Sequence, residues 1–181
     1  MKKVLAILMA LVMVLALAAC SKAPVTEENT TEADVQNAVE ETSEAAVSGD
    51  SVAKTLAAEF KALAATETDA EALAGKLAQS SAVAAISPAA MPVEAGFLTG
   101  FDNVEIKDFE KGAMFAPMIG TIPFVGYVFT LTDGADVDAF VKTLEDNANL
   151  RWNICTMADE MVAVAEGNVV FFVMAPASFD A

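Results

Sequence analysis

Hydrophobic residues recur at helical spacing directly after residue 50. The residues on this pattern are Val52, Leu56, Phe60 and Leu63. Positions three or four apart lie on one face of an α-helix, so the spacing predicts an amphipathic helix that starts near Ser51. A second helix is predicted from residues 68–71, whose sequence TDAE is a capping-box pattern, and from Leu73 and Leu77 one turn later. We expect this helix to end by Gln79.

The pattern becomes irregular between residues 80 and 103. Ser87-Pro88, Met91-Pro92 and Gly96 interrupt any regular periodicity there. We therefore expect this segment to cross the domain without regular secondary structure.

Alternation of apolar and other residues predicts strands in the second half of the chain. Residues 104–106 and 113–116 are short β candidates, and residues 123–131 form the clearest strand. Residues 161–165 and 169–174 are two further β runs joined by the sequence EGN, which predicts a closing hairpin.

Helical spacing returns once between these strands. The residues that carry it are Val137, Phe140, Val141 and Leu144. They predict a third helix that ends near Asn147. Helices and strands are segregated along the chain instead of strictly alternating, which indicates the α+β class. We expect a mostly antiparallel sheet of four or five strands, packed on one face by about three helices, in a single globular domain over residues 51–181.

The first twenty residues, MKKVLAILMALVMVLALAAC, have the layout of a secretory leader. Lys2 and Lys3 precede an uninterrupted run of 16 apolar residues, which is shorter than the ~20 residues that a membrane-spanning helix needs. The closing tetrapeptide LAAC resembles the lipobox of bacterial lipoproteins. The resemblance implies that a leader over residues 1–19 is cleaved between Ala19 and Cys20.

It also implies that a diacylglyceryl group modifies the Cys20 sulfur. Two acyl chains make anchoring stable, whereas a single chain holds a protein only marginally. The expected location is therefore extracytoplasmic, on the outer leaflet of the cell membrane in a Gram-positive host. In a Gram-negative host, Ser21 in place of a retention aspartate indicates the outer membrane. The layout of a lipobox followed by a strand, a helix and a final apolar hairpin is similar to that of small lipoproteins of unknown function in Gram-positive anaerobes.

Residues 20–50 combine the lipidated cysteine with an acidic segment. From residue 21 to residue 50 there are eight acidic side chains, one basic side chain and no aromatic residue. Such a composition cannot bury enough apolar surface to offset the entropy lost on ordering. We expect a disordered, self-repelling tether, with a weak helix over residues 35–46 as the alternative.

Composition excludes several partners and chemistries. The formal charge of -16 opposes binding to nucleic acid, and any membrane contact must come from lipid or apolar residues rather than from a basic patch. The chain has no histidine, which removes imidazole metal sites and the commonest general base. We expect no cofactor.

Three groups of polar residues have the composition of a site, but each has a simpler interpretation. Ser51 and Lys54 match the S-x-x-K spacing of penicillin-recognising enzymes, yet the companion S-D-N and K-T-G sequences are missing, so we expect Ser51 to cap a helix. Aspartates near the third helix offer oxygen ligands for a cation, but helix capping explains them without a metal. These aspartates are Asp133, Asp136 and Asp138. A third group is expected to be solvated surface rather than a catalytic pair. Its carboxylates are Asp102, Glu105, Asp108 and Glu110.

Cys155 is the single cysteine outside the lipobox. Without a histidine to activate it, we expect its thiol to behave as a small buried hydrophobe beside Trp152 and Ile154.

The segment over residues 112–127, GAMFAPMIGTIPFVGY, is uncharged and contains three glycines and two prolines. One interpretation is two buried strands joined by a turn. The other is an exposed apolar loop that holds an envelope protein or a hydrophobic ligand. The candidate surface residues are Met114, Phe115, Met118, Ile119, Ile122 and Phe124.

The leading functional hypothesis is a non-enzymatic binding or accessory domain of the cell envelope. The alternatives are a small carboxylate- or cation-dependent enzyme and a structural envelope component. Two inward carboxylates in a deep pocket would favour the enzyme, an apolar patch near residues 114–124 would favour binding, and a structural component predicts neither.

Overall fold

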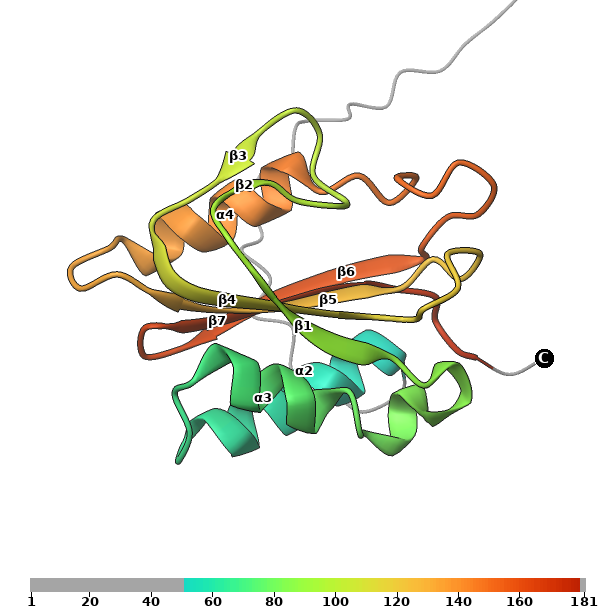
Figure 1. Cartoon of the computed structure of the whole chain (residues 1–181), viewed down its shortest axis with the longest axis horizontal. Helices are drawn as coiled ribbons and strands as arrows, with labels where there is room; N and C mark the ends of the chain where they lie inside the picture. Colours follow the sequence, from blue (N-terminus) through green and yellow to red (C-terminus); the bar gives the residue numbers. More distant parts are fainter. Residues whose placement is uncertain (1–50, 180–181) are drawn as a thin grey trace, which may run out of the picture. The chain divides into compact units, whose positions relative to one another are not determined.

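A five-stranded antiparallel sheet organises residues 51–179, which are the residues that the structure, a computed structural model, describes (Figure 1). The strands are β1 (Ala89–Val93), β4 (Phe109–Ala116), β5 (Val125–Leu131), β6 (Glu160–Glu166) and β7 (Val169–Ala175). Their order in the sheet is β1-β4-β5-β7-β6, and every neighbouring pair is antiparallel. The predicted α+β class and the antiparallel sheet are confirmed.

The three predicted helices are present, and each begins with a side-chain cap. They are α2 (Val52–Ala64), α3 (Ala70–Leu77) and α4 (Val137–Asn147). The Ser51 hydroxyl accepts a hydrogen bond from the Lys54 backbone N–H at 3.4 Å, so the cap interpretation of this serine is confirmed. At the second helix the cap is the Asp69 carboxylate, which accepts from the Ala72 N–H at 3.0 Å.

The helices cover both faces of the sheet. Helices α2 and α3 lie below it in Figure 1, whereas α4 lies above it beside a small ribbon formed by β2 (Gly96–Phe97) and β3 (Glu105–Ile106). The expectation that all helices share one face is therefore corrected.

The sequence of β7 gives the physical reason for the two-sided cover. All seven of its residues, VVFFVMA, are buried. Phe171 and Val173 pack with α2 and α3, while Phe172 and Met174 face the α4 side. A continuous apolar run instead of an alternating one is typical of a strand buried on both faces.

Stacked and tilted aromatic rings fill both cores. On the α2 side the Phe60 and Phe171 rings stack with centroids 5.3 Å apart. On the α4 side Phe129 lies between Tyr127, at 5.6 Å, and Phe140, at 5.3 Å. The central strands are therefore held rigidly between two aromatic layers, and their ends are positioned with them.

The segment over residues 80–103 is more regular than expected. Residues Ser81–Ile86 form a 3-10 helix, η1, and β1 follows it at an edge of the sheet. Pro92 in this strand lies opposite Ala113 of β4. An edge strand tolerates proline because one side of the strand has no ladder partner. Pro92 therefore marks an edge strand, whereas Pro88 lies in the break between η1 and β1.

The remaining strand predictions hold with two adjustments. Residues 104–106 contribute β3, which pairs with β2 and not with the main sheet, and β4 begins at Phe109, four residues earlier than expected. The closing hairpin of β6 and β7 is confirmed, and Gly167 adopts a φ of 60° in its turn.

Several predictions fall outside the described residues. These are the leader over residues 1–19, the modified Cys20 and the acidic tether up to residue 50. Within residues 51–179, no helix combines the length and the hydropathy that crossing a bilayer requires.

Candidate functional site: an apolar tip

Two loops meet at one end of the sheet. Residues 117–124 connect β4 to β5, and residues 148–159 connect α4 to β6; both loops lie toward the right in Figure 1. The Asn153 side-chain amide donates to the Gly120 carbonyl at 2.6 Å, and the Thr156 hydroxyl donates to the Thr121 carbonyl at 3.2 Å. The two loops therefore form one surface although they are separated by a strand and a helix in the sequence.

Four large apolar side chains on these loops are exposed. They are Met118 at 77%, Ile119 at 72%, Ile154 at 96% and Met157 at 46% exposure. We call this set the apolar tip. It holds four of the six exposed large apolar side chains of residues 51–179. Single apolar side chains are common on protein surfaces, but a group of them at one place is typical of an interaction surface.

The tip is almost free of charge in a strongly acidic chain. Residues 112–132 contain no charged residue, and Arg151 is the only one among residues 148–158. The net charge of -16 therefore resides elsewhere, and the tip can approach an apolar surface without removing a carboxylate from water.

A hollow of about 460 Å³ opens between the two loops. Met114, Ile122 and Trp152 contribute to its lining, together with Ile154 and Cys155. These side chains make the lining largely apolar, which suits a hydrophobic group better than a charged one.

A buried phenol fixes one rim of this hollow. Thr99 lies at the rim, and its carbonyl accepts a hydrogen bond from the Tyr127 hydroxyl at 2.8 Å. Burial raises the pKa of the Tyr127 phenol well above its usual value of 10, so the group stays protonated and keeps donating at neutral pH. The rim is therefore held to the centre of β5.

The six candidate residues of the uncharged segment are divided between surface and core. Met118 and Ile119 are exposed, and Met114 and Ile122 are partly exposed beside the hollow. Phe115 is fully buried on the α2 side of the sheet, and Phe124 is 2% exposed. Each interpretation of the segment thus describes part of it, because buried strands flank a loop whose middle is exposed.

Cys155 is exposed, so its interpretation as a buried thiol is wrong. The prediction relied on its neighbours Trp152 and Ile154 being core residues. Trp152 is only partly buried and Ile154 is the most exposed large apolar residue of the described part of the chain. The physical reason is that residues 148–159 form the loop between α4 and β6, where apolar composition does not imply burial.

The contribution of this second loop was missed in the sequence. Its apolar residues are interspersed with polar ones and follow neither the spacing of a helix nor the alternation of a strand. Long-range contacts, among them the hydrogen bonds to Gly120 and Thr121, hold it beside the predicted surface, and such contacts have no local sequence pattern.

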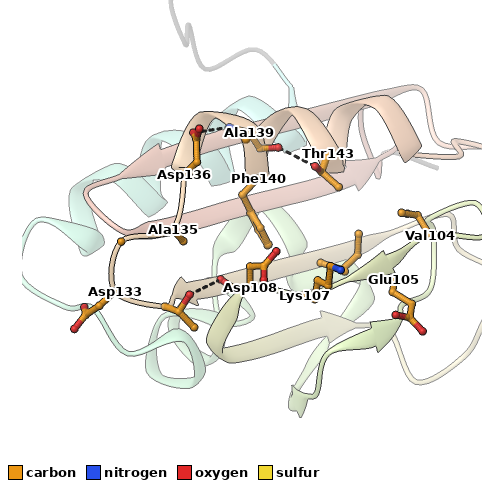
Figure 2. Close-up of a pocket in the computed structure, with 13 residues that line it drawn as sticks. Val104, Glu105, Lys107, Asp108, Asp133, Ala135, Asp136, Ala139, Phe140 and Thr143 are labelled. Carbon is orange, nitrogen blue, oxygen red and sulfur yellow. Dashed lines mark hydrogen bonds between the residues drawn. The ribbon is translucent and has the colours of Figure 1, made fainter.

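Several of the predicted carboxylates surround a different hollow, of about 430 Å³, beside the start of α4 (Figure 2). Glu105, Asp108, Asp133 and Asp136 line it, and all four are exposed. Figure 2 shows Glu105 and Asp133 at opposite ends, pointing away from each other. Among residues 51–179 no group of three or more acidic or cysteine side chains could hold a metal ion. The Glu105 and Asp133 carboxylates therefore do not form the inward pair that the enzyme hypothesis requires.

The remaining carboxylates have structural or solvated roles. The Asp136 carboxylate accepts from the Ala139 N–H at 3.0 Å, which confirms it as the cap of α4. Asp138 lies in the first turn of that helix, where negative charge is favourable. The Asp102 carboxylate accepts from the Asn149 side chain at 2.8 Å, and Glu110 is exposed.

Comparisons with protein-family models, with curated proteins and with solved structures gave no match. The functional argument therefore depends on the geometry of the tip and on the sequence of the leader.

Proposed function

We propose that the protein is a membrane-anchored, extracytoplasmic lipoprotein, and that its domain acts in the cell envelope as a non-enzymatic binding or accessory module. In this proposal the lipid on Cys20 fixes the chain to the membrane, and the apolar tip is the binding surface. The observation that carries the proposal is the exposure of four large apolar side chains on two hydrogen-bonded loops.

The free energy of solvation explains why the tip supports binding. Covering a large aliphatic side chain removes apolar area from water and contributes about 1.5–3 kcal/mol when the side chain is fully buried. Ile119 and Ile154 are largely exposed, so most of that contribution is still available to a partner. Candidate partners are an envelope protein on the tip and a hydrophobic ligand in the adjoining hollow.

The two alternative functions receive less support. A carboxylate- or cation-dependent enzyme needs converging acidic groups, whereas Glu105, Asp108, Asp133 and Asp136 are exposed around an open hollow. A structural envelope component would need no exposed apolar patch, so this alternative does not explain the apolar tip.

Mass spectrometry of the cell-derived protein tests the anchor. We expect a mature chain that begins at Cys20 and carries acyl groups on that residue. The variant Cys20→Ser lacks the thiol that would be acylated, so we expect it to be absent from the membrane fraction. An unmodified Cys20 behind an intact leader would contradict the proposal.

Site-specific photo-crosslinking in intact cells tests the tip. A photoreactive residue at position 119 or 154 is expected to form an adduct, because both side chains project from the tip. Position 97 is the matched control, since Phe97 on β2 is 71% exposed but lies outside both loops. Adducts that are equally frequent at all three positions, or absent from all, would refute a binding role for the tip.

A further inference from the structure

We infer that the apolar tip docks onto the surface of the lipid bilayer to which the lipid on Cys20 would attach the chain. This inference rests on the proposed function, because it assigns phospholipid as the partner of the proposed binding surface. It also gives the domain a defined orientation on the membrane.

The described part of the chain begins at the end of the sheet that carries the apolar tip. Helix α2 starts at Val52, whose backbone N–H donates to the Ala177 carbonyl at 3.2 Å. The Ala177 N–H in turn donates to the Asp159 carboxylate at 2.9 Å. Asp159 ends the loop that carries Ile154 and Met157, so the point where residues 1–50 join the domain lies at the same end of the sheet as the tip.

Contacts between the C-terminal segment and the first tip loop also place the start of α2 at this end of the sheet. The segment after β7 returns to the first tip loop, since the Phe179 and Phe124 rings meet edge to face with centroids 5.9 Å apart. Both tip loops are thus connected, through β7 and its extension, to the start of α2. A chain held by its N-terminal segment can therefore present the apolar tip to the membrane, and the domain does not have to rotate first.

A second observation is the chemistry of the tip. Exposed isoleucine and methionine side chains suit the acyl region of a bilayer, and Trp152 is a partly buried aromatic residue with a polar N–H, a type enriched at membrane interfaces. Arg151 beside it can reach phosphate groups while its stem covers apolar surface. A protein partner could also cover these side chains, but the position of the tip beside the tether favours lipid.

A third point is effective concentration. Thirty residues separate Cys20 from Ser51. If they form the predicted tether, its root-mean-square length is about 30 Å, and tethering at such lengths gives effective concentrations of the order of millimolar. Weak affinity of the tip for lipid is then sufficient for docking.

Tryptophan quenching in vesicles provides the test, because Trp152 is the only tryptophan and lines the hollow between the two tip loops. The lipidated full-length protein, purified from cells, is incorporated into phosphatidylcholine vesicles with or without bromine on the acyl chains. Flotation with the vesicles reports the anchor, and quenching by bromine reports the contact of the tip with lipid. We expect flotation and strong quenching.

Variants identify which side chains make the contact. Each of Ile119→Ser and Ile154→Ser is expected to lower the ratio of docked to undocked protein by about 10-fold, while flotation is unchanged. Phe97→Ser is the matched control and should keep the full quenching. Because all three side chains are exposed, the unfolding temperature should stay the same in every variant.

The outcomes separate the inference from the proposed function. Flotation without quenching would overturn the docking while leaving the anchor and the proposed binding role of the tip intact. Quenching that persists when both isoleucines are replaced would also overturn the docking. Failure to float would overturn the anchor and the docking together.

Discussion

Gly126 is a position where the fold depends on the absence of a side chain. It lies in the middle of β5, directly opposite Phe115 of β4, and the Phe115 ring covers it. A Cβ atom added at Gly126 would lie 2.3 Å from two atoms of that ring, whereas ordinary van der Waals contact begins at about 3.4 Å. The change Gly126→Ala therefore forces the ring or the strand to move.

The expected loss of stability follows from two opposing terms. Overpacking a buried site costs about 1–3 kcal/mol, and this overlap is deep and involves a fully buried ring, which places it toward the upper end. Replacing glycine with alanine also restricts the unfolded chain, which stabilises the fold by about 0.4–1 kcal/mol. We expect a net decrease of about 2 kcal/mol in the free energy of unfolding.

Urea unfolding followed by circular dichroism measures this change on a chain that starts at residue 21. The same experiment is carried out on Phe115→Leu and on the double variant. If the ring and the new methyl group collide, the double variant is more stable than the sum of the single changes predicts, by about 0.5–3 kcal/mol. Strict additivity would refute the steric argument, and so would an unchanged stability of Gly126→Ala.

Three further changes test other parts of the structure. Asp69→Ala removes the α3 cap and the 2.7 Å ion pair with Lys111, so urea unfolding should show a loss of about 0.5–2 kcal/mol, whereas Asp69→Asn should retain the cap and most of the stability. The Lys111 hydrogen bond lowers the pKa of the Asp69 carboxyl. The charge on Asp69 therefore stabilises the fold fully above the unfolded pKa of about 4, and this stabilisation is lost as the pH falls through the lowered value. The free energies of unfolding of the wild type and Asp69→Asn should thus become equal in acid. Asp136→Ala should cost about 0.5–2 kcal/mol as a lost cap, and millimolar calcium should leave the unfolding temperature of the wild type unchanged; a calcium-dependent increase would revive the cation hypothesis. Cys155, the only thiol after residue 20, should react with a maleimide in the native state as fast as in urea, whereas protection in the native state would contradict its exposure.

Features with local determinants were predictable from the sequence. Helices α2 and α4 and the closing hairpin follow from apolar spacing, from the caps Ser51 and Asp136, and from the turn at Gly167. Each of these depends on residues within a few positions of one another. The unusual composition of the uncharged segment singled it out as a candidate surface, and the structure exposes Met118 and Ile119 there while it buries Phe115 and Phe124.

Features set by distant partners were not predictable in the same way. β1 was missed because proline suppresses the strand pattern, although an edge position removes that penalty at Pro92. The exposure of Ile154 depends on a loop that pairs with Gly120 across more than thirty residues. The burial of Phe115 beside exposed Met118 depends on where β4 ends, and strand ends are poorly defined by composition.

The proline in β1 has a consequence for a protein that is crowded on a surface. If the proposed lipid anchor holds the protein, its copies share two dimensions, and their edge strands would encounter one another far more often than in free solution. A backbone that lacks one N–H in mid-strand is a poor template for adding a neighbouring chain. Pro92 thereby opposes the pairing of neighbouring copies at the β1 edge of the sheet.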